Sequence, residues 1–77
     1  HEENEKEEIK NLNTTLLLSP DNEEAMYMLI NIKLKKSNFS EVKNLTKKFI
    51  IVCSKLCDKK NDIEERLKDI EASKESN

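Results

Sequence analysis

The chain has 77 residues, of which 39% are charged and 35% are apolar, and its formal net charge is −2. So short a chain buries a modest share of its surface and can hold one small domain at most. Glycine is absent, proline occurs once, and the two phenylalanines and one tyrosine are too few for a β-sandwich or barrel, which needs many strands and glycine-rich turns. We therefore expect an all-α fold.

The N-terminal part combines an acidic segment with a first amphipathic helix. We predict residues 1–8 to be an acidic tail or the frayed start of a helix. Further along, apolar residues recur at spacings of three and four: Ile9, Leu12 and Leu16, with Leu17 and Leu18 alongside. This spacing predicts a helix with one buried stripe. We expect it to end before Pro20, which suits the first turn of a second helix.

The second predicted helix carries an apolar face and a separate polar stripe. Glu23 and Glu24 suit a helix N-terminus. The apolar face consists of Ala25, Met26, Leu29, Ile30 and Leu34. Tyr27, Asn31 and Lys35 follow one another at intervals of one helical turn and form the polar stripe.

A short turn around Ser37 precedes a third helix, for which Asn38 and Glu41 fit a capping box. The third helix has the most regular apolar seam of the chain: Val42, Leu45, Phe49, Val52 and Leu56, broadened by Ile50, Ile51 and Cys53. So wide an apolar face must be covered on more than one side. A fourth helix, capped by Asn61 or Asp62, carries Ile63, Leu67 and Ile70, and we expect residues 73–77 to fray.

Charge is unevenly distributed along the chain. Residues 1–24 hold eight acidic residues and two lysines, residues 25–60 hold nine lysines and two acidic residues, and residues 61–77 hold six acidic and three basic residues. We expect the acidic end helices to face the basic central hairpin and partly neutralise it. A nucleic-acid interface is the less favoured interpretation, because duplex-binding domains are usually basic overall.

Cys53 and Cys57 are the only cysteines and lie one helical turn apart. Two thiols alone cannot form a structural zinc site, and His1 is remote in sequence. We expect both to pack as small apolar residues in a reducing compartment, the cytoplasm or the nucleus. A disulfide or redox pair is the minority alternative, because the spacing is CxxxC and bonds within one helix are uncommon.

Several of these residues match a repeat pattern. The matching residues in the first helix of the pattern are Ala25, Met26, Tyr27, Leu29 and Asn31, followed by Phe39. Those in the second helix are Val42, Thr46, Phe49, Ile50 and Val52. In this pattern the chain resembles the tetratricopeptide family, with one repeat preceded by the second half of another over roughly residues 8–52. Ile30, Val42 and Phe49 depart from it where small residues are expected, and Ser54 stands in place of a proline.

The resemblance implies a right-handed stack of antiparallel helical hairpins, about four helices in all. It divides the chain into an acidic tail or helix start at 1–8, a three-helix segment at 9–57 and a capping helix at 58–77. First helices of such repeats line a groove that receives peptides, so the resemblance implies Tyr27, Asn31 and Lys35 as candidate partner-binding residues. The expected role is protein–protein interaction or scaffolding within a larger chain or assembly, with another protein, neighbouring helices or a second copy as partner.

No catalytic, cofactor-binding or metal-binding residues emerge from the sequence. The one histidine is residue 1, and without glycine no phosphate-binding loop is possible. We therefore do not expect an enzyme, and no apolar run reaches the roughly 20 residues of a membrane span.

Two alternative functions stay open. One is a bundle that binds nucleic acid through a set of lysines: Lys33, Lys35, Lys36, Lys43, Lys47 and Lys48. The other is a secreted or surface helical antigen, with the cysteines oxidised and the sequons at Asn13, Asn38 and Asn44 used.

Overall fold

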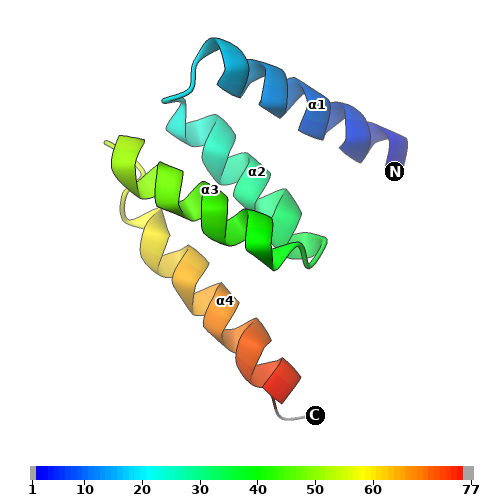
Figure 1. Ribbon diagram of the computed structural model, residues 1–77, viewed down its shortest axis with the longest axis vertical. Helices are drawn as coiled ribbons and strands as arrows, with labels where there is room; N and C mark the ends of the chain where they lie inside the picture. Colours follow the sequence, from blue (N-terminus) through cyan, green and yellow to red (C-terminus); the bar gives the residue numbers. More distant parts are fainter. Residues whose placement is uncertain (1, 76–77) are drawn as a thin grey trace.

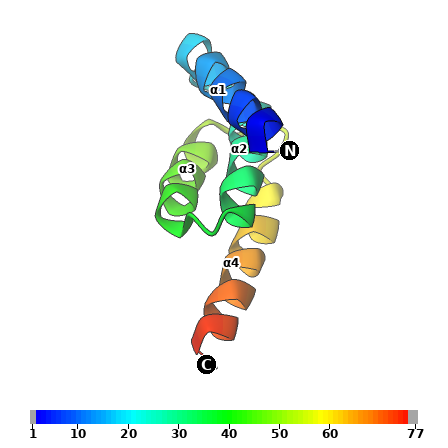
Figure 2. The ribbon, with the colours of Figure 1, turned by 90° about the vertical axis from the view of Figure 1, so that its right-hand side faces the viewer.

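The computed structural model describes the backbone of residues 2–75 and the side chains of residues 4–71. Within these residues the fold is all-α. It consists of four helices: α1 (Glu2–Leu18), α2 (Glu23–Lys35), α3 (Phe39–Val52) and α4 (Lys59–Glu75). Successive helices double back on one another and spread like a fan (Figure 1). The molecule measures 41 × 31 × 16 Å, so it is a thin slab, as the edge-on view shows (Figure 2).

Helix α2 is the centre of the fold because it is apolar on two faces. One face packs on α3 and α4 in a cluster formed by Met26, Ile30, Leu34, Val42, Phe49 and Ile63. The other face packs on α1 in a second cluster formed by Leu12, Ala25, Leu29 and Ile32. Two rows of residues at helical spacing therefore hold neighbours on both sides of one helix. The most extensive helix–helix packing joins α2 to α3, and the α3–α4 packing is the smallest of the three consecutive pairs.

The start of α1 resolves one open alternative. The acidic segment is helical from Glu2 onward and is continuous with the residues that follow, whereas residue 1 lies outside the described part. At the other end of the chain, α4 continues to Glu75, so residues 73–75, which we expected to fray, are helical. Residues 76–77, which belong to the same expectation, lie outside the described part.

Two predictions about helix starts are wrong, and a third, Asn38 as the N-cap of α3, is right about the position only. Pro20 lies in the turn before α2, and Asn22 is the N-cap, its side-chain oxygen accepting a hydrogen bond from the Ala25 N–H at 3.0 Å. Asn38 does precede α3, but its side chain makes no capping hydrogen bond. Because α4 begins at Lys59, Asn61 and Asp62 lie inside the helix and do not cap it.

The end of α3 also differs from expectation. The apolar seam predicts a helix through Leu56, yet α3 ends at Val52 and Cys53 is extended, with φ −63° and ψ 148°. Leu56 still packs against the main core cluster, from a loop instead of from a helix. The seam predicted Val42 and Phe49 correctly as buried, and its other three members are half-buried. It was wrong for Ile50 and Ile51, which are 42% and 81% exposed, because no helix covers that side of α3 among the described residues. It also misplaced the helix end, because a loop that folds back can bury Leu56 as well as a helix can.

The end of α2 is a Schellman motif built without glycine. Ser37 adopts a positive φ of 62°. Its N–H bonds the Leu34 carbonyl at 3.1 Å, and the Asn38 N–H bonds the Lys33 carbonyl at 2.9 Å. Glycine is the usual residue at this position, since a side chain disfavours the left-handed conformation.

We expect Ser37→Gly to raise the free energy of unfolding by about 0.5–1 kcal/mol, because glycine removes the left-handed penalty. The matched control is Ser40→Gly, at a serine that is also exposed but lies within α3, where glycine should lower stability by a similar amount. Urea unfolding followed by circular dichroism measures both. Stabilisation by both changes, or by neither, would contradict the conformational argument.

We expect Ile63→Ala to lower the free energy of unfolding by about 2–5 kcal/mol, because the side chain is fully buried where α4 meets the core. Ile51→Ala makes the same truncation at a residue 81% exposed and should change stability by at most about 0.5 kcal/mol. The same urea titration compares them. A small effect at Ile63 would mean that α4 is not part of the cooperative core.

Candidate interaction surface

The polar stripe of α2 is engaged within the chain. The Tyr27 hydroxyl lies 3.2 Å from Asp62 Oδ2, and its ring packs on Phe49 with ring centroids 6.1 Å apart. Arg66 donates a hydrogen bond to the Asn31 side-chain oxygen. Both bonds join α2 to α4, so the structure brings Tyr27 and Asn31 together under α4 as an interhelical contact.

Lys35, the third residue of the stripe, takes part in a different contact. Its amine lies 3.1 Å from Glu5 Oε2 on α1, and the Lys36 amine lies 3.0 Å from Glu5 Oε1. Hydrogen bonds from Lys36 and Lys35 lower the pKa of Glu5 below its ordinary value. The stripe therefore divides between two neighbouring helices, and α4 covers the part that was expected to receive a partner.

Ion pairs confirm that the acidic end helices face the basic hairpin. Besides the Glu5 pairs, Lys43 on α3 lies 3.4 Å from Glu71 on α4. Lys33 pairs weakly with Glu41 at 3.9 Å, within the hairpin itself. Lys47 and Lys48 make no ion pair among the described residues. These two lysines of α3 are therefore not neutralised by an ion pair among the described residues.

An apolar groove of about 490 Å³ lies between α1 and α3. Its lining consists of Asn13, Leu16, Leu17, Pro20, Met26, Leu29, Glu41, Leu45 and Lys48. The buried Met26 and Leu29 of α2 form its floor, whereas Leu17 is 82% exposed at its edge. We call this the α1–α3 groove. Apolar surface rimmed by polar residues is typical of a binding groove.

The sequence contains one signal for this groove, the run of three leucines at the end of α1. We interpreted that run only as part of a buried stripe. One buried stripe of a helix accommodates Leu16, but three consecutive leucines necessarily place some of their side chains outside that stripe. In the structure Leu17 and Leu18 are 82% and 81% exposed. This excess of large apolar residues over the positions that one helix can bury leaves apolar surface exposed at the end of α1.

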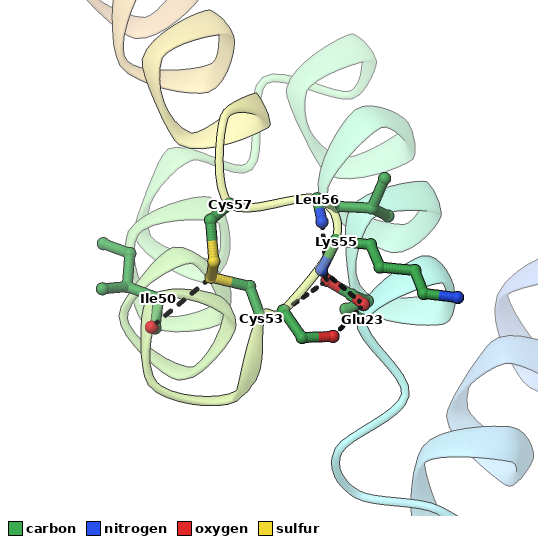
Figure 3. Close-up of a disulfide and its surroundings, with 7 residues drawn as sticks. Glu23, Ile50, Cys53, Lys55, Leu56 and Cys57 are labelled. Atoms are coloured by element: carbon green, nitrogen blue, oxygen red, sulfur yellow. Dashed lines mark hydrogen bonds between the residues drawn. A yellow bond between two sulfur atoms is a disulfide. The ribbon is translucent and has the colours of Figure 1, made fainter.

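A second feature ties the start of α2 to the loop between α3 and α4. The carboxylate of Glu23 accepts hydrogen bonds from the N–H groups of Ser54 at 2.9 Å, Lys55 at 3.1 Å and Leu56 at 2.9 Å. The Ser54 hydroxyl adds another at 3.0 Å. We call this arrangement the Glu23 clasp (Figure 3). Consecutive backbone N–H groups that converge in this way form an anion-binding concavity, which here holds a side chain of the same protein.

Cys53 and Cys57, which flank the clasp, form a disulfide with their Cα atoms 5.2 Å apart (Figure 3). The expectation of two unpaired thiols is wrong. It assumed that both cysteines lie on one helix, where such a bond is uncommon. Because α3 ends at Val52, the pair closes a loop instead, and the loop brings the sulfur atoms together.

The clasp strongly favours the ionised form of Glu23. Hydrogen bonds from the N–H groups of Ser54, Leu56 and Lys55, with the Ser54 hydroxyl, outweigh desolvation and lower its pKa from 4.5 to about 2. Hydrogen bonds to a carboxylate act in this direction because they are stronger for the charged form than for the neutral acid.

Comparisons with known proteins identify no relative. No family model, no curated protein and no solved structure matches this chain. Among residues 2–75, no helix is both long and apolar enough for a membrane crossing. The tetratricopeptide resemblance therefore stays a prediction.

The clasp predicts a specific dependence of stability on pH. Because the pKa of Glu23 is about 2 in the folded state and 4.5 otherwise, its contribution is complete above pH 4.5 and is lost as the pH falls to about 2. In Glu23→Gln that contribution should be missing, so the gap between the two proteins should be largest above pH 4.5 and should close towards pH 2.

Urea unfolding at a series of pH values between about 6 and 2 measures this gap. Glu24→Gln is the matched control, since it neutralises the adjacent, exposed glutamate, and it should not reproduce the pH-dependent gap. A gap between wild type and Glu23→Gln that does not vary with pH would show that ionised Glu23 is not held by the loop.

Proposed function

We propose that this chain is a helical protein-interaction segment of tetratricopeptide type, and that the α1–α3 groove is its binding surface. The observation that carries the proposal is the combination of a concave apolar lining with Leu17 exposed at its edge. A large apolar side chain left exposed beside a groove is more simply explained by a contact than by folding. The interaction surface thus differs from the Tyr27–Asn31–Lys35 stripe that the resemblance implied.

The way the helices pack supports the repeat character of the proposal. The main packing joins each helix to the next along the chain, which is the arrangement of stacked helical repeats. The three bulky residues that depart from the family pattern, Ile30, Val42 and Phe49, are each fully buried in the main cluster. In a regular repeat, small residues at these positions let the helices approach closely. Here the three bulky side chains occupy the space between the helices.

The partner that best fits the groove is an acidic amphipathic helix. Helices present apolar residues one turn apart, which suits a groove lined by Leu16, Leu17 and Leu45. Lys48 at the rim has no acidic partner within the described residues, and Lys47 lies next to it in sequence. The acidic lining residue Glu41 already faces Lys33. Lys48 at the rim can therefore pair with an acidic residue of the partner.

The disulfide favours an oxidising compartment over the cytoplasm or nucleus that we expected from the sequence. The sequon residues Asn13, Asn38 and Asn44 are all exposed, which is compatible with that setting. A role as a nucleic-acid binder has less support. Of the six lysines assigned to it, four take part in ion pairs: Lys33, Lys35, Lys36 and Lys43. We propose a binding role without catalysis.

We expect the oxidised protein to bind a designed helical peptide with three leucines on one face and glutamates beside them, measured by fluorescence anisotropy. Leu17→Lys should weaken binding by about tenfold or more, because it places an ammonium in the apolar contact. The control is Ile51→Lys, which introduces the same charge at a residue equally exposed but outside the groove lining, and it should bind like wild type.

A basic peptide with the same leucine face serves as the test of charge. It should bind more weakly than the acidic peptide, and the difference should shrink as salt is added. Equal loss with Leu17→Lys and Ile51→Lys, or no binding of any leucine-faced peptide, would overturn the groove as the site. Concentration-dependent self-association, abolished by Leu17→Lys, would instead identify a second copy as the occupant.

A further inference from the structure

The disulfide closes a loop that joins no distant parts of the chain. Cys53 and Cys57 are four residues apart in sequence, so the bond removes little freedom from the unfolded chain as a whole. Its effect must pass through the shape of the loop it encloses. That loop contributes the N–H groups of Ser54, Lys55 and Leu56 to the Glu23 clasp. The covalent ring and the carboxylate therefore act on the same three residues.

The loop also determines where α4 begins. Helix α4 starts at Lys59, two residues after Cys57. Two hydrogen bonds attach it to α2: the bond between Tyr27 and Asp62 and the bond between Asn31 and Arg66. Ile63 is buried in the core, and Leu67 and Ile70 pack half-buried against the same cluster. A change in the loop that reorients the start of α4 acts directly on these attachments.

We infer that the Cys53–Cys57 disulfide and the Glu23 clasp form a redox-controlled latch that holds α4 against α2. In the oxidised state the loop is shaped to bind Glu23 and α4 covers Tyr27 and Asn31. In the reduced state the loop is free to release Glu23, α4 is held less firmly, and Tyr27 and Asn31 become accessible. The inference is independent of the α1–α3 groove, whose lining contains no residue of the latch.

The reductant is a dithiol, and its approach is open. Cys57 is exposed, whereas Cys53 is half-buried and its sulfur lies 3.6 Å from the Ile50 carbonyl oxygen (Figure 3). A thiolate of the dithiol attacks the sulfur of Cys57, the S–S bond breaks, and Cys53 leaves as a thiolate that takes up a proton. The second thiol of the reductant then displaces the sulfur of Cys57 and closes the reductant's own disulfide. Two thiols on the protein and one oxidised reductant result.

The direct test is amide hydrogen exchange of the full chain with its disulfide intact and after treatment with dithiothreitol. Reduction should speed exchange at Ser54, Lys55 and Leu56 by about tenfold or more, and should raise exchange along residues 63–70 of α4. The amides of Leu29 and Ile30 in the centre of α2 should keep their protection. Unchanged exchange in the loop, with two free thiols confirmed by alkylation, overturns the latch, as does an equal loss of protection in α2 and α4.

A second test does not require the reduced protein to stay folded. If the disulfide favours the clasp, the clasp must favour the disulfide by the same factor. Glu23→Gln should therefore make the disulfide easier to reduce, shifting its equilibrium with dithiothreitol by about threefold to tenfold towards the thiols. Glu24→Gln, a matched change at the next residue, should leave the equilibrium where it is in wild type. An identical equilibrium in wild type and Glu23→Gln overturns the coupling.

Discussion

The hydrogen bonds between the Glu23 carboxylate and the loop after α3 fix where α4 leaves the helical hairpin. Three consecutive N–H groups, at residues 54–56, lie in a loop and have no helix to bond to. Backbone donors without partners destabilise a fold, and one carboxylate from the first residue of α2 satisfies all three. The contact joins the beginning of the central helix to the connection that sets the course of α4.

The same contact explains one departure from the repeat pattern. Where the tetratricopeptide pattern leads us to expect proline, this chain has Ser54, whose N–H and hydroxyl both bond Glu23. Proline has no N–H and could not make the first of these bonds. Ser54 departs from the family pattern, but this loop requires a residue with an N–H group at that position. The disulfide around it completes a small, closed structure that the family pattern does not include.

Helix α2 shows how one amphipathic pattern can serve three neighbours. Its two apolar rows face α1 on one side and α3 with α4 on the other. Its polar stripe is directed to α4 through Tyr27 and Asn31 and to α1 through Lys35. Most of this helix is therefore engaged within the chain, and its part in the proposed binding surface is limited to Met26 and Leu29 at the floor of the α1–α3 groove.

Local patterns in the sequence predict the all-α class, the apolar face of α2, Val42 and Phe49 in the core of α3, and the pairing of acidic end helices with a basic hairpin. These predictions depend only on the spacing of apolar residues and on the charge of each segment, and both properties can be counted along the chain. The end of α3, the disulfide, the clasp and the cover over Tyr27 and Asn31 were decided by tertiary structure. The clasp and the bonds that cover Tyr27 and Asn31 join residues about 30 positions apart in sequence. The end of α3 and the disulfide depend on the loop that binds Glu23. Helical periodicity cannot predict such contacts, because the same apolar seam continues from Val52 to Leu56 whether the backbone stays helical or turns to bind Glu23.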